Sequence, residues 1–128
     1  MGNLWKVAVA VIGLLLAVLG LRWMLFPGFA AVEIGMVLST PVALNTARGD
    51  IGGLFIGGAI LCFLGLYTGE RRWLDAVALV IACIAIGRTI GILADGFFPV
   101  SVISIVVELV MVRVLIGASR AHRAAARA

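Results

Sequence analysis

The sequence predicts an all-α integral membrane protein, a four-helix bundle with a short interfacial helix between its first and second helices. Of its 128 residues, 64% are hydrophobic and only 12% are charged, whereas about 25% of the residues in a soluble domain are charged. A chain of this length cannot bury so much apolar surface in one core, so its surroundings must be lipid. Long apolar runs recur along the chain and are separated by prolines and short polar turns.

The first predicted helix covers about residues 4–26, and it is too long for the apolar region of a cleaved signal peptide, which usually has about 7–15 residues. Pro27 ends this helix, because a proline cannot continue the hydrogen-bond ladder. The next apolar run, residues 29–38, is too short to span a bilayer and stops before Pro41. These features predict a short helix that is either interfacial or re-entrant.

The second and third helices are predicted at about residues 48–68 and 73–94. Each contains small residues at intervals of four, a pattern that lets another helix backbone approach closely. These predicted packing ridges are formed by Gly49, Gly53 and Gly57 in the second helix and by Cys83, Gly87 and Gly91 in the third. We expect the ridges to pack within the bundle, against a second copy of the chain or against a partner membrane protein.

The fourth helix is predicted at about residues 100–117, since Asp95 and Pro99 end the third. A single transmembrane domain would then cover residues 1–118, and residues 119–128 would form a basic tail. Positive charge gathers in this tail and in the turn between the second and third helices. The positive-inside rule places both on the cytoplasmic side, so we expect both termini to be cytoplasmic.

Arg88 stands inside an apolar helix, where an arginine costs roughly 2.5–3.5 kcal/mol on insertion scales. It lies seven residues before Asp95, and therefore about 10 Å from the outer end of its helix. Glu108 lies seven residues after Ser101, which puts it at the same depth in the fourth helix and on the face of Ser101 and Ser104. We therefore predict that Arg88 and Glu108 interact directly or through one water.

Other polar residues, among them Arg22, Glu33, Arg48 and Asp50, also fall in the outer half of the predicted bundle. The candidate ligand site consists of Arg48, Asp50, Arg88, Asp95, Ser104 and Glu108. In one interpretation they line an outward-facing pocket, where the arginines attract a small amphipathic or anionic ligand or a lipid and the carboxylates orient them. In the other, the charges are internal ion pairs of a structural or assembly protein with a chaperone-like role.

Several classes of function are disfavoured. Nucleic-acid binding needs a basic face with polar surroundings, which the sequence lacks. No metal site and no cofactor are predicted, because Cys62 and Cys83 lie in apolar runs and the lone His122 is in the tail. A small membrane enzyme with Glu108 or Asp95 as acid or base, or a transporter, stays an alternative, although no nucleophile–base pair supports catalysis.

The sequence also resembles an uncharacterised family of bacterial membrane proteins, domain of unknown function 4345. The resemblance rests on RGDIGGLFIG from Arg48, IGRTIGILADG from Ile86 and VVEL from Val106, and it covers roughly residues 25 to 118. It implies a four-helix, multi-pass protein of the bacterial inner membrane and brings no activity with it. A further likeness to DoxX-like four-helix proteins is one of architecture only.

Overall fold

The structure, a computed structural model, describes the backbone of residues 2–125 and the side chains of residues 2–121. The helices are α1 (Asn3–Leu25), α2 (Pro27–Glu33), α3 (Pro41–Thr46), the π-helical segment η1 (Ala47–Gly52), α4 (Gly53–Thr68), α5 (Arg71–Asp95) and α6 (Pro99–Ala125). Within the described residues, four helical stretches are long and apolar enough to cross a membrane, with α3, η1 and α4 forming one continuous stretch. The predicted all-α class with four membrane-spanning helices is confirmed.

The second membrane-spanning stretch begins at Pro41, earlier than the predicted start near residue 48. Thr40 caps this helix, because its hydroxyl oxygen accepts a hydrogen bond from the Ala43 backbone N–H at 3.1 Å. A proline suits the first helical position, where no backbone donor is needed. The Thr-Pro pair is therefore a helix start, and the polar segment after it lies inside the helix.

The α6 helix continues to Ala125, past the predicted end at residue 117. Gly117 is an interior residue, and a Cβ built on it would lie 2.5 Å from Cη2 of Trp5. It therefore accommodates a neighbouring ring instead of ending the helix. The alanines and arginines that follow favour helix. Most of the predicted basic tail is thus helical, and residues 126–128 lie outside the described part of the chain.

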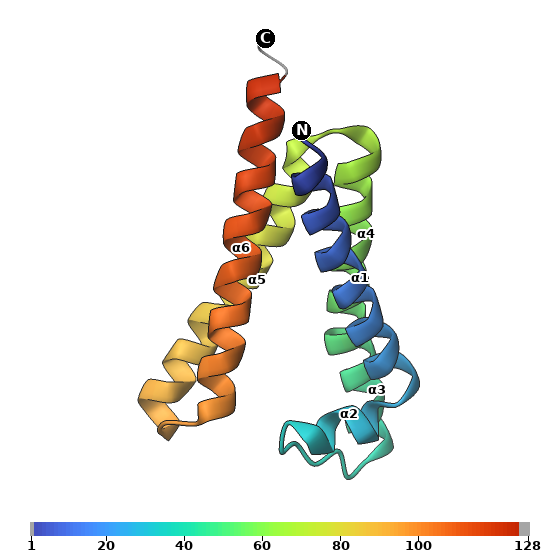
Figure 1. The fold of residues 1–128 in the computed structure, drawn as a ribbon. Helices are drawn as coiled ribbons and strands as arrows, with labels where there is room; N and C mark the ends of the chain where they lie inside the picture. Colours follow the sequence, from blue (N-terminus) through green and yellow to red (C-terminus); the bar gives the residue numbers. More distant parts are fainter. Residues whose placement is uncertain (1, 126–128) are drawn as a thin grey trace. The chain divides into compact units, whose positions relative to one another are not determined.

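The chain forms two compact units, which we describe separately. The Arg88 unit contains the residues up to Ala10 and those from Leu61 onward. In it, α5 packs antiparallel to α6 after a short turn that starts at Gly96, whose φ of 106° favours glycine (Figure 1). Leu74 and Leu115 are fully buried in this unit.

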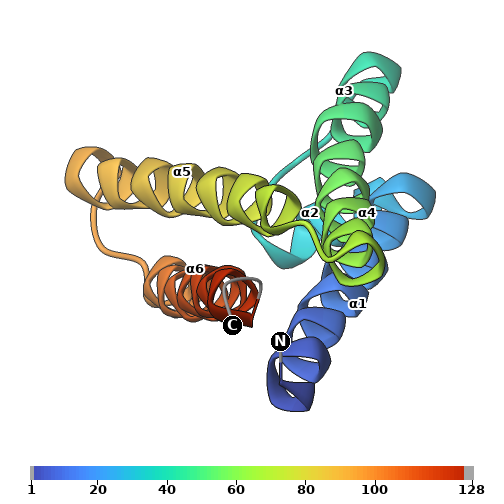
Figure 2. The ribbon, with the colours of Figure 1, turned by 90° about the horizontal axis from the view of Figure 1, so that it is seen from above.

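The Arg48 unit contains Val11–Ile60, and in it α1 lies beside α4 (Figure 2). Two glycines allow the close approach of the helices. A Cβ on Gly20 would lie 2.9 Å from the backbone nitrogen of Ile56, and one on Gly52 would lie 3.2 Å from that of Met24. Because backbone atoms cannot move aside as a flexible side chain can, these two contacts set the helix spacing.

The predicted ridges do not make such contacts. Among the described residues of its own unit, no neighbouring atom lies within 4 Å of a Cβ built on Gly49, Gly53 or Gly57, and the same holds for Gly87. The close approach uses the next face of the helix, where Gly52 lies. A spacing of four predicts a smooth face but cannot tell which of two adjacent glycine faces meets the partner.

A small hydrophobic core lies between the end of α1, α2 and the start of η1 in the Arg48 unit. It consists of Trp23, Ala30, Ala31 and Ala47, with Leu38, Ile51 and Phe55 packed against it. Trp23 has only 6% of its surface exposed. The alanines let α2 and the start of η1 come close to the end of α1, and this arrangement positions Arg48.

Candidate functional site

Arg88 and Glu108 form an ion pair that joins α5 to α6. Arg88 Nε donates a hydrogen bond to Glu108 Oε1 at 2.7 Å. The Glu108 side chain is 13% exposed and that of Arg88 is 42% exposed. Equal distances from the turn bring the two side chains together, as their spacing in the sequence indicates, so the predicted direct interaction is present.

The pair leaves hydrogen-bonding groups unused. Glu108 Oε2 is buried and has no hydrogen-bond partner in the described part of the chain. Arg88 uses Nε alone, although a guanidinium and a carboxylate often pair through two parallel hydrogen bonds. The pair therefore neutralises both charges without satisfying every donor and acceptor.

Ser104 and Asp95 do not join the pair. The Ser104 hydroxyl donates to the backbone oxygen of Val100 at 3.0 Å, a local bond within α6. Asp95 is the exposed last residue of α5, and it makes no ion pair with any described side chain. Of the four predicted site residues in the Arg88 unit, the structure brings together two.

Arg48 lies in η1, and its Nε donates to the backbone oxygen of Met24 at 3.1 Å. Since α1 ends at Leu25, Met24 belongs to the last turn, whose carbonyl oxygens have no partner within their own helix. A cation is favourable there, because the carbonyl dipoles point toward it. Arg48 therefore caps α1, and within the described residues its two terminal nitrogens have no hydrogen-bond or ion-pair partner.

Arg48 also lines an open pocket of about 440 Å³, which we call the Arg48 pocket. All its other lining residues are apolar: Leu25, Phe26, Pro27, Gly28, Phe29, Val32 and Leu44. The pocket forms because α2 begins directly after α1 and presents Phe29 and Val32 beside the end of that helix. These residues were not among the predicted site residues, although Pro27 between two phenylalanines indicates a bend with apolar walls.

A second ion pair supports this arrangement. Arg22 on α1 bonds to Glu33, the last residue of α2, so the pair holds the far end of α2 against α1. Asp50, in contrast, is exposed and makes no ion pair or side-chain hydrogen bond among the described residues. The Arg48 unit therefore has one cation, Arg48, that is fixed in place and not neutralised.

A family model described as Domain of unknown function (DUF4345) matches residues 4–119. The chain belongs to this family. Neither a curated protein nor a solved structure matches it. DUF4345 is an uncharacterised family, so membership assigns no function to this chain.

Proposed function

We propose that this multi-pass membrane protein binds an amphipathic anion, with the anionic group at Arg48 and the apolar body in the Arg48 pocket. The observation that carries the proposal is the pairing of one uncompensated guanidinium with an otherwise apolar wall. An uncharged apolar ligand would leave the cation unpaired, and a small hydrophilic anion would leave the apolar wall unused. A molecule with one anionic end matches both parts.

The charge argument rests on how Arg48 is held. A carbonyl oxygen fixes the side chain through Nε but carries no net charge, so the positive charge stays available. The terminal nitrogens of a guanidinium bond to both oxygens of a carboxylate or phosphate at once. In a low-dielectric membrane setting, such a bond is stronger than it would be in water.

The size argument rests on the pocket. A volume of about 440 Å³ falls in the usual range for small-molecule sites, about 300–1,000 Å³. Phe29 and Val32 are 76% and 73% exposed, so a ligand would cover apolar surface that the protein itself leaves open. Burial of that surface contributes roughly 25 cal/mol per Å².

The membrane orientation is part of the proposal. Arg71 and Arg72 start α5, and Arg120 lies near the end of α6, so the basic residues gather at one end of the α5–α6 pair. The positive-inside rule puts that end in the cytoplasm and the turn after Asp95 outside. A reporter fused after Gly96 should then read external, and one fused at the C-terminus should read cytoplasmic. The opposite pattern would overturn the orientation.

The binding proposal is tested with oleate and oleyl alcohol, which share a chain and differ in the charge of the head group. Thermal unfolding of the purified protein in detergent should shift upward with oleate and much less with the alcohol. At a ligand concentration one hundred times Kd, the stabilisation is about 2.7 kcal/mol. Equal shifts with both compounds would show that the positive charge plays no part.

Two variants address the two parts of the pocket. Arg48→Gln should remove the difference between oleate and oleyl alcohol, and Phe29→Ala should weaken the effect of both. Arg71→Gln is the matched control, because it removes the same charge from a residue that does not line the pocket. If Arg71→Gln removed the difference between oleate and oleyl alcohol as fully as Arg48→Gln, general charge attraction would explain the binding.

A structural or assembly role is the second candidate, and the Arg88–Glu108 pair favours it for the α5–α6 helices. There the charges are internal and neutralise each other, so no ligand is required to explain them. Native mass spectrometry of protein taken from membrane-derived nanodiscs distinguishes the two roles. A retained small molecule supports binding, whereas a bare chain joined to other membrane proteins supports assembly.

A further inference from the structure

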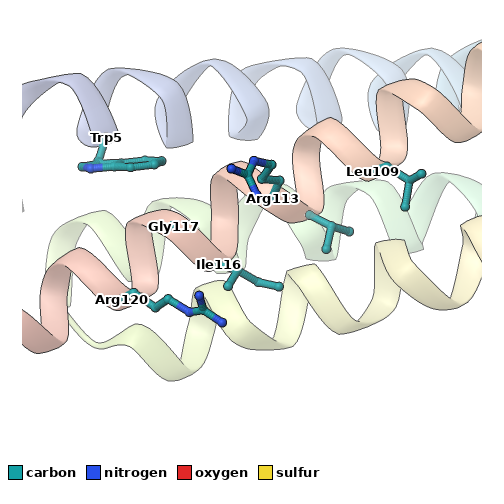
Figure 3. A pocket seen from close by; sticks show the side chains of 7 residues that line it. Trp5, Leu109, Arg113, Ile116, Gly117 and Arg120 are labelled. Atoms are coloured by element: carbon teal, nitrogen blue, oxygen red, sulfur yellow. The ribbon is translucent and has the colours of Figure 1, made fainter.

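A second pocket, of about 430 Å³, lies in the Arg88 unit between the start of α1 and the later part of α6. Its polar lining residues are Arg113 and Arg120, which stand on the two sides of Gly117 along α6, with Trp5 of α1 facing that helix (Figure 3). Leu109, Val112 and Ile116 provide the apolar part. We call it the Trp5 pocket.

In the wall of the Trp5 pocket, the indole ring of Trp5 packs closely against Gly117. A Cβ built on Gly117 would lie 2.5 Å and 2.7 Å from two ring carbons of Trp5. Only glycine lets the indole lie this close to the backbone of α6. Tryptophan is also enriched where the hydrocarbon of a bilayer meets its headgroups, which suits a pocket at the end of a membrane-spanning helix.

Among the described residues, Arg113 and Arg120 have no acidic partner. In this unit Glu70, Asp75 and Glu108 are each paired with another arginine, respectively Arg72, Arg71 and Arg88. The remaining acid, Asp95, lies at the opposite end of α5. Two positive charges therefore line one pocket without neutralisation by any acidic residue of the unit.

The lining of the Trp5 pocket changes from apolar to basic along α6. Arg120 lies eleven positions after Leu109, which corresponds to about 16 Å along the helix axis. The apolar residues Leu109 and Val112 are on the side of the membrane centre, and Arg120 is on the side of the helix end. Arg113 is between them, and its long side chain can reach toward the surface by snorkelling.

We propose that the Trp5 pocket binds the phosphate of an anionic phospholipid from the leaflet at this end of the helices. Arg120 contacts the phosphate from the side of the helix end, and Arg113 contacts it from the side of the membrane centre. An acyl chain lies along Leu109, Val112 and Ile116. Trp5 packs at the level of the glycerol backbone. Basic pockets between membrane helices are a known way to hold anionic headgroups, and this site is separate from the Arg48 pocket in both residues and unit.

The test uses the full-length protein in nanodiscs that contain equal amounts of phosphatidylglycerol and phosphatidylcholine. After gentle release, native mass spectrometry counts the lipids that stay bound. Phosphatidylglycerol should be enriched on the natural protein, and the double variant Arg113→Gln/Arg120→Gln should lose roughly ten-fold or more of that enrichment. Equal retention of the two lipids by the natural protein would overturn the proposal.

Three further measurements separate the pocket from simpler causes. The double lysine variant, Arg113→Lys/Arg120→Lys, should keep most of the enrichment because it keeps both charges. Arg71→Gln should keep all of it, and an equal loss there would assign the effect to overall charge. An excess of inorganic phosphate should not displace the lipid, since the free ion lacks an acyl chain. Displacement would point to a free-phosphate site.

The glutamine variants must also fold for the comparison to count, and thermal unfolding in detergent checks this. Should the double variant be unfolded, Arg120→Gln alone serves as the test, because Arg120 is exposed on α6. Its expected loss of enrichment is smaller but still greater than that of Arg71→Gln. An unchanged enrichment in a folded Arg120→Gln protein would overturn the proposal.

Discussion

Arg88 and Arg48 are both arginines inside membrane-spanning helices, yet they are held in different ways. Arg88 pairs with the carboxylate of Glu108 on a neighbouring helix, so the positive charge is cancelled where it stands. Arg48 bonds to the backbone oxygen of Met24, which fixes its position without cancelling its charge. A carboxylate partner neutralises the arginine and joins two helices. A carbonyl partner fixes the arginine in place and leaves its charge available to a ligand.

The surroundings of the two arginines reinforce this difference. Arg88 lies between two helices that pack along their length, and its partner Glu108 is largely buried. Arg48 lies at the edge of an open apolar pocket formed by short, irregular elements. The neutral pair thus joins two regular antiparallel helices. The uncompensated cation lies where the chain bends from α1 into the short helix α2.

The largest expected effect comes from separating the Arg88–Glu108 pair. Arg88→Met or Glu108→Gln should each destabilise the protein, because removing one partner strands the other charge, at a cost of up to about 3–5 kcal/mol when both are buried; Arg88 is 42% exposed. In a membrane a stranded charge can find water or another polar partner, which reduces the loss. The double variant should recover part of it, and thermal unfolding of all four proteins measures the coupling. Strictly additive losses would mean that the two residues do not interact.

The next effect concerns the two adjacent glycines beside Arg48. Gly52→Ala should destabilise the protein by about 1–3 kcal/mol, because its Cβ would press on Met24, the residue whose carbonyl holds Arg48. Gly53→Ala meets no atom of its own unit and should be neutral or stabilising by up to about 1 kcal/mol. Unfolding in detergent gives both values. A large loss in Gly53→Ala alone would show that this face packs against another surface.

A smaller effect is expected for Arg48 itself. Arg48→Gln removes a cation from a helix end, which is worth about 0.3–1 kcal/mol at exposed sites. Its effect on unfolding should therefore be well below that of Arg88→Met, even though it should remove the preference for oleate over oleyl alcohol. If Arg48→Gln destabilised the protein as strongly as Arg88→Met, the distinction between Arg88 as a structural residue and Arg48 as a ligand-binding residue would be wrong.

The smallest effect is expected for Ser104, one of the predicted site residues. Its hydroxyl bonds to the backbone of its own helix, so Ser104→Ala should change stability by less than about 0.5 kcal/mol. It should also leave the coupling between Arg88 and Glu108 unchanged in a triple-variant comparison. A changed coupling would return Ser104 to the site.

The sequence was enough to predict the parts of the structure that depend on distance along a helix. Apolar runs predicted the membrane-spanning helices, and equal spacing from one turn predicted that Arg88 and Glu108 meet. Both predictions need only a regular rise per residue and an antiparallel pair.

The remaining features depend on direction as well as distance. Whether Gly52 or Gly53 faces α1 differs by one residue, which is about 100° of rotation around the helix. The Arg48 pocket needs α2 to turn back beside α1, and that turn depends on the small alanines against Trp23 as much as on Pro27. Apolarity alone carries no information about such angles.

The π-helical segment η1, which contains Arg48, has a consequence for how this region tolerates changes in length. A π turn amounts to one extra residue inserted into an α-helix. Deleting Gly49 would let the ladder close as a regular α-helix, because the wide turn already absorbs the extra residue locally. The same deletion within α4 would instead rotate the rest of that helix by about 100°. Loss of a single codon should therefore disturb the packing of the chain less at η1 than within α4.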